Sequence, residues 1–67
     1  MNRQSQARAI ANGRRNRVNT SIGKVVAEVI CPTADDAREV LAAFGRAGWS
    51  TSFQGIENKT VRAEVKP

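Results

Sequence analysis

The residues most clearly suited to binding a ligand are the arginines in the first quarter of the chain. Residues 1 to 17 contain five arginines and no acid: Arg3, Arg8, Arg14, Arg15 and Arg17. From residue 18 onward, the lysines and arginines equal the acids in number, so the net charge of +5 belongs to the N-terminal segment. Arginine forms paired hydrogen bonds with phosphate and stacks on bases. The segment therefore predicts binding to a polyanion, with nucleic acid as the first candidate.

Neighbouring polar residues extend this candidate site. Asn12 and Asn16 can donate to and accept from base edges, and Lys24 adds a further cation at the start of the folded body. Segments of this composition often stay unfolded until they bind. We predict eight nucleic-acid-binding residues: Arg3, Arg8, Asn12, Arg14, Arg15, Asn16, Arg17 and Lys24. Arg14, Arg15 and Arg17 are the foremost candidates for phosphate contact because they cluster beside the body.

An acidic protein surface is the alternative partner for the same charge. In that interpretation the chain is a small inhibitor or adaptor, of the kind that phages and other mobile elements encode. It would bind a host protein complex through its folded surface, and the basic segment would only steer association. A solvated tail without a binding role is the third interpretation.

Catalysis is disfavoured by residues that the chain lacks. It contains no histidine and no tyrosine, so the commonest general base is missing. The single cysteine, Cys31, cannot form an intrachain disulfide and has no histidine to activate it. Adjacent Asp35 and Asp36 diverge on a first helical turn, where helix capping explains them. We therefore expect a non-enzymatic protein without a cofactor or a metal site.

The elements that must position the arginines follow from hydrophobic periodicity. Residues 24–31 and 60–65 predict strands, residues 49–54 predict a third, and residues 34–47 predict a helix with Thr33 as its N-cap. We expect an α+β protein in which residues 1–20 form a basic arm that is flexible or marginally helical. Residues 21–67 then form a β-α-β-β domain. Its sheet has three mostly antiparallel strands in the order 1-3-2, with one helix packed on one face.

The aromatic residues are predicted to belong to the core. Phe44 lies on the apolar stripe of the helix, and Trp49 and Phe53 share the strand face expected beneath it. The sheet would then lack the exposed aromatic platform of single-strand binders, which leaves the arm as the main contact.

Size and composition also predict the oligomeric state and the cellular location of the protein. A body of fewer than about 50 residues usually needs help to fold, so we expect a homodimer. A free thiol without an apolar leader or membrane span indicates a cytoplasmic protein that does not contact membranes.

Overall fold

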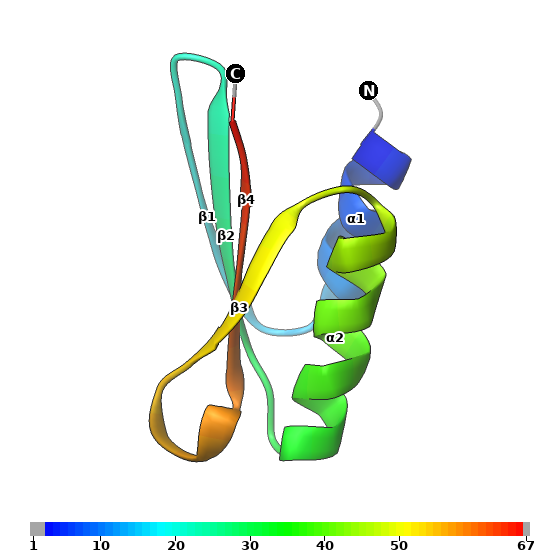
Figure 1. Cartoon of the computed structure of the whole chain (residues 1–67), viewed down its shortest axis with the longest axis vertical. Helices are drawn as coiled ribbons and strands as arrows, with labels where there is room; N and C mark the ends of the chain where they lie inside the picture. The colour runs from blue at the N-terminus through cyan, green and yellow to red at the C-terminus, as the bar shows by residue number, and fades with distance from the viewer. Residues whose placement is uncertain (1–2, 67) are drawn as a thin grey trace.

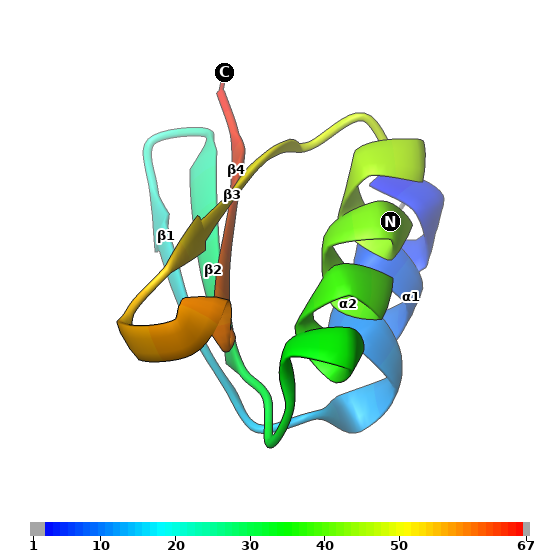
Figure 2. The same ribbon diagram turned by 60° about the horizontal axis from the view of Figure 1, so that its bottom comes forward.

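The computed structural model describes residues 3 to 66. Met1 and Asn2, which belong to the expected arm, and Pro67 lie outside the described residues. The elements in chain order are α1 (Arg3–Gly13), β1 (Asn16–Ser21), β2 (Lys24–Ile30), α2 (Ala34–Arg46), β3 (Ser50–Gln54), the 3-10 turn η1 (Ile56–Asn58) and β4 (Thr60–Val65). The four strands form one antiparallel sheet in the order β1-β2-β4-β3. Both helices lie side by side on one face of the sheet, and the other face is uncovered (Figures 1 and 2).

The α+β class is confirmed, but the prediction of three strands and one helix was wrong in number. The three expected strands are β2, β3 and β4, and they lie in the expected order. The additional strand, β1, consists of residues 16–20 of the expected arm together with Ser21, and it pairs with β2 along its whole length. All six of its residues are exposed, and Val18 is its one large apolar side chain. Backbone pairing holds this strand, so its sequence shows no hydrophobic alternation.

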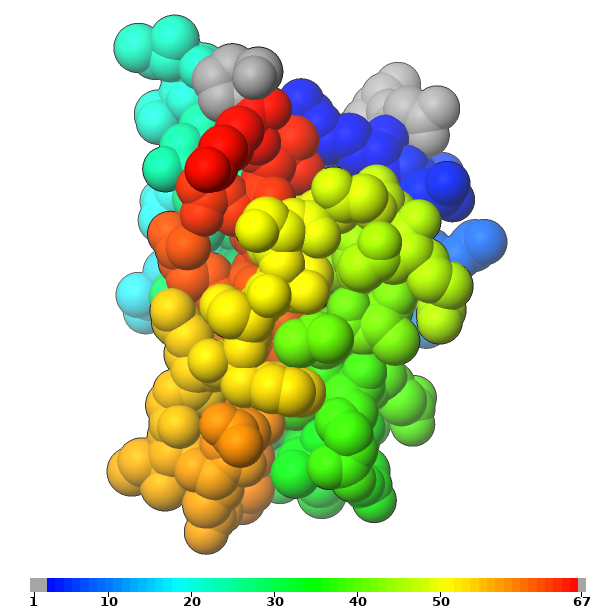
Figure 3. All heavy atoms as spheres, viewed as in Figure 1, coloured from blue at the N-terminus to red at the C-terminus, as the bar shows by residue number. Residues whose placement is uncertain are grey.

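The turn between β1 and β2 also lacked its usual sequence signal. Ile22 and Gly23 both have positive φ, at 38° and 79°. Two-residue hairpin turns of this kind favour Asn-Gly or Asp-Gly, because a β-branched residue is strained there. The side chain of Ile22 is 96% exposed at the tip of the hairpin, which projects beyond the rest of the sheet (Figure 3).

The core lies between the sheet and α2. Alternate residues of β2 and the residue after it are buried, as predicted, and Ala37, Val40 and Phe44 meet them from α2. Trp49 is 4% exposed and packs edge-on against Phe44, with ring centroids 4.8 Å apart. Phe53 lies on the same sheet face but at the edge, where it is 38% exposed. Phe44 and Trp49 are thus in the core as predicted, whereas Phe53 is partly exposed, and these three rings form no exposed row on the described sheet.

The caps of α2 explain where this helix begins and ends. The Thr33 side chain accepts a hydrogen bond from the Asp36 backbone N–H at 3.1 Å, which confirms the predicted N-cap. At the other end Gly48 has φ 87°, the left-handed conformation that glycine adopts without steric cost. The backbone N–H of Trp49 then donates to the carbonyl of Phe44 at 3.1 Å. These contacts end α2 and direct the chain into β3, which begins at Ser50.

The backbone of α1 has the left-handed sense. From Gln4 to Asn12, φ lies between 44° and 63° and ψ between 36° and 65°. Such a helix costs L-residues about 1–2 kcal/mol each, or roughly 9–18 kcal/mol over these nine positions. That sum is comparable to the whole free energy of unfolding of a small domain, about 5–15 kcal/mol. We therefore expect α1 to exchange with disordered or right-handed conformations in solution, as its composition predicts.

Candidate nucleic-acid interface

The arm's arginines separate into one anchored side chain and four exposed ones. Arg3 and Arg8 lie on α1, Arg15 lies in the bend after it, and Arg17 lies on β1. All four are exposed, whereas Arg14 is half-buried with 26% of its side chain accessible. The predicted cluster of Arg14, Arg15 and Arg17 is therefore adjacent in sequence but divided in its contacts.

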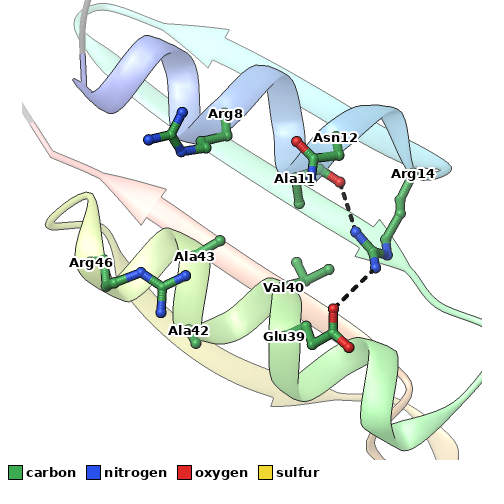
Figure 4. A pocket seen from close by; sticks show the side chains of 9 residues that line it. All are labelled: Arg8, Ala11, Asn12, Arg14, Glu39, Val40, Ala42, Ala43 and Arg46. Atoms are coloured by element: carbon green, nitrogen blue, oxygen red, sulfur yellow. Dashed lines mark hydrogen bonds and ion pairs between the residues drawn. The ribbon is translucent and has the colours of Figure 1, made fainter.

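Arg14 is held by the body of the protein. Its guanidinium donates to Asp36 Oδ1 at 3.1 Å and to the Ala11 carbonyl at 3.0 Å, and it lies 3.7 Å from Glu39 Oε1. Figure 4 shows the side chain reaching from the end of α1 to Glu39 on α2. The hydrogen bond with Asp36 raises the pKa of Arg14, with a smaller opposing effect of burial. Its positive charge is thus largely compensated within the fold.

Arg15 and Arg17 lie together at the edge of the sheet. The Ile30 backbone N–H donates to the Arg15 carbonyl at 2.8 Å, so pairing with β2 continues one residue before β1 begins. Because side chains alternate along a strand, Arg15 and Arg17 point to the same face. Arg17 is paired in register with Glu28, whose neighbours Ala27 and Val29 are buried beneath the helices. The two arginines therefore belong to the uncovered face.

The remaining predicted site residues are Asn12, Asn16 and Lys24, and the latter two make contacts within the protein. The Asn16 side-chain amide donates to the Arg14 carbonyl at 2.7 Å, which supports the bend between α1 and β1. Asn12 is exposed near the end of α1. Lys24 Nζ lies 3.1 Å from Glu64 Oε2, and Arg62 approaches the other oxygen of the same carboxylate at 2.8 Å. Lys24, then Arg62, lowers the pKa of Glu64 by hydrogen bonding.

Acidic partners distinguish the cations of the body from those of the arm. Arg38 pairs with Asp35, Lys59 pairs with Glu57, and Glu64 receives both Lys24 and Arg62. Within residues 3 to 66, six cations have no ion pair to an acid: Arg3, Arg8, Arg15, Arg17, Arg46 and Lys66. Four of these six are arginines of the arm. The unbalanced charge seen in the sequence thus remains unbalanced in the fold.

Arg46 was not among the predicted site residues. It lies in the last turn of α2 and faces Arg8 across a pocket of ≈ 260 Å³ between the two helices (Figure 4). Its position outside the apolar stripe of the predicted helix was the available signal. α1, whose backbone is strained, forms one wall of this pocket, so a change in α1 would alter the pocket's shape. Arg8 and Arg46 therefore place two positive charges near each other without forming a cavity of fixed shape.

The described part of the chain offers little for other chemistry. It contains no group of three metal-ligating side chains among histidine, cysteine and acids. Cys31 is 4% exposed, and burial raises the pKa of its thiol, which disfavours the reactive thiolate. No helix within residues 3 to 66 has the length and apolar character needed to cross a membrane. Comparison with known protein families, curated proteins and solved structures finds no match to this chain.

Proposed function

We propose that this protein binds nucleic acid through the exposed arginines of its N-terminal segment and acts without catalysis. The observation that carries the proposal is the unequal pairing of its cations. Within residues 3 to 66, Arg3, Arg8, Arg15 and Arg17 are exposed and have no acidic partner, whereas most cations of the body are paired. An unpaired cation that contacts a phosphate releases counterions and so increases the affinity, whereas a paired cation must first break its internal contact.

The arginines differ in how their backbone is held, and this difference gives them different proposed roles. Arg17 lies on β1 and the Arg15 carbonyl bonds to β2, so the backbone positions of both are set before binding and little ordering is required. Arg3 and Arg8 lie on a segment whose backbone is strained, so it can reorganise around a bound strand. We assign Arg14 to anchoring the segment on α2 through Asp36. The proposed phosphate contacts are therefore four rather than five.

The chemistry of the site indicates which part of a nucleic acid it would contact. The phosphate backbone satisfies arginine forks in any nucleic acid, and the described sheet has no exposed aromatic row on its uncovered face. We therefore expect binding dominated by backbone charge, with sequence preference contributed by reorganisation of the arm around structured RNA or a DNA groove.

A matched pair of variants tests the proposal. Arg15→Gln with Arg17→Gln removes two unpaired cations, and Arg38→Gln with Lys59→Gln removes two paired ones, so both variants lose the same net charge. At physiological salt we expect the first variant to bind duplex DNA or structured RNA at least about tenfold more weakly than the second. Fluorescence anisotropy of labelled oligonucleotides measures both affinities. Equal losses would show that only net charge matters, and absence of binding in the unaltered protein would redirect the search to an acidic protein partner.

A further inference from the structure

β1 is an exposed edge strand that the fold leaves open to further pairing. It is the outermost strand on its side of the sheet, and all six of its residues are exposed. Protein edges are usually protected by short length, charged side chains, proline or a covering element, because an open edge recruits another strand. β1 contains no proline, Arg17 is its one charged residue, and all six of its residues pair with β2. A partner strand therefore fits here without displacing anything.

The pairing with β2 determines which backbone groups face outward. In an antiparallel pair, residues alternate between those that bond to the neighbour and those whose N–H and C=O point away from it. The carbonyl of Arg15 bonds to β2, so Arg15, Arg17, Asn19 and Ser21 direct their backbone groups inward. Asn16, Val18 and Thr20 consequently present their N–H and C=O groups along the free edge.

The sequence of β1 is self-complementary about Val18. An antiparallel copy centred there places Val18 opposite Val18 of the partner subunit, in a hydrogen-bonded pair. Arg17 then meets an asparagine, Arg15 meets a serine, and Asn16 meets a threonine, because positions on either side of the centre exchange. Val18 is 39% exposed and lies on the helix side, opposite fully buried Ala27. A second copy in this register would cover part of that apolar surface.

Other centres fit less well. Centring on Arg17 places two arginines directly opposite each other, and like charges in that position are destabilising. Centring on Asn19 brings Asn16 against Ile22, which lies in the turn rather than the strand, so fewer residues pair. The Val18 centre pairs every residue from Arg15 to Ser21.

We propose that two copies of this chain associate edge to edge along β1, centred on Val18, to form one continuous eight-stranded sheet. This inference goes beyond the proposed function and does not depend on it. The second copy is the occupant because its strand satisfies the free edge with no like charges directly opposed, and because so small a domain gains stability from association. The pairing also brings Arg15 and Arg17 of both copies into one strip on the uncovered face, with the two Arg17 Cα atoms about 7–8 Å apart.

Disulfide trapping tests the register directly. In a Cys31→Ala background, Val18→Cys places two thiols in a directly opposed pair with Cα atoms about 5.5 Å apart, within reach of a disulfide. Asn19→Cys is the matched control, since it is equally exposed but lies diagonally from its copy at about 7–8 Å. We expect mild oxidation to cross-link the first protein and leave the second uncoupled. Equal cross-linking of the two would overturn the proposed register.

Sedimentation of the unaltered protein tests whether the association occurs. Because the four arginines of the strip repel one another, raising salt from roughly 0.05 to 0.5 M should strengthen the dimer. Salt has the opposite effect on nucleic-acid binding, so failure of one proposal is distinguishable from failure of the other. Val18→Arg should raise the dissociation constant by about tenfold or more, while urea unfolding shows that the monomer fold persists. A protein that stays monomeric at about 1 mM in high salt, or a dimer indifferent to Val18→Arg, would overturn the proposal.

Discussion

The anchoring of Arg14 on α2 leads to a quantitative prediction. Arg14 and Asp36 have 26% and 30% of their side chains exposed, and a charged hydrogen bond of 3.1 Å joins them. Exposed ion pairs contribute about 0.2–1 kcal/mol, and partial burial with a direct hydrogen bond places this pair at the upper end of that range. We expect a coupling free energy of about 1 kcal/mol between the two side chains.

A double-mutant cycle isolates that coupling. The variants are Arg14→Gln, Asp36→Asn and the combination of both, which keep side-chain size while removing charge. Unfolding by urea can be followed through Trp49, the only tryptophan of the chain, which is buried against Phe44. For a domain of this size, a loss of about 1 kcal/mol lowers Tm by about 4–8 °C. Asp36 also favours the start of α2, and the cycle subtracts that separate effect.

The Arg14→Gln variant also tests the assignment of Arg14 as an anchor rather than a phosphate contact. Removing one phosphate contact on duplex DNA makes the slope of log affinity against log salt shallower by about 0.9. We expect Arg15→Gln to show this change and Arg14→Gln to leave the slope unaltered. A coupling free energy near zero, together with a shallower slope for Arg14→Gln, would refute the reasoning.

Three further predictions concern the body. Thr33→Ala removes the side chain that accepts from the Asp36 N–H, and should lower the free energy of unfolding by about 1 kcal/mol in urea titrations. Lys24 and Arg62 lower the folded-state pKa of Glu64, so its contribution to stability is complete above the ordinary glutamate pKa of about 4.3 and is lost as pH falls below it. Glu64→Gln should therefore be less stable than the unaltered protein at neutral pH, with a difference that narrows in acid; a constant difference would contradict the assigned cause. Gly48→Ala, at φ 87°, should destabilise the fold by about 1 kcal/mol, whereas Gly45→Ala within α2 should stabilise it by a similar amount, since no neighbour lies within 4 Å of the added carbon.

The sequence predicted the elements whose hydrophobic side chains show which face is buried. α2 has an apolar stripe and a threonine cap, and β2 and β4 alternate, so the position and order of these elements were recoverable. β1 was missed because backbone bonding, rather than burial, holds it, and Ile22-Gly23 replaces the usual hairpin turn residues. The expected arm, residues 1–20, consequently overlaps the sheet from Asn16 onward.

The candidate site was predictable in its charge but not in its contacts. Composition alone indicates an unbalanced arginine segment. The pairing of Arg14 with Asp36, 22 residues along the chain, and of Lys24 with Glu64 depends on tertiary packing, so no local pattern reveals them. Only the fold separates anchored arginines from exposed ones.

The most direct measurement of the central claim is the salt dependence of nucleic-acid affinity for the unaltered protein. Four phosphate contacts per chain predict a slope of log affinity against log salt, for each bound chain, of about −3.6 on duplex DNA and about −2.8 on a single strand. Binding should persist at physiological salt, and replacing Arg3, Arg8, Arg15 and Arg17 together with glutamine should abolish it. Binding that disappears by about 0.15 M salt, or that survives the fourfold replacement, would contradict the account.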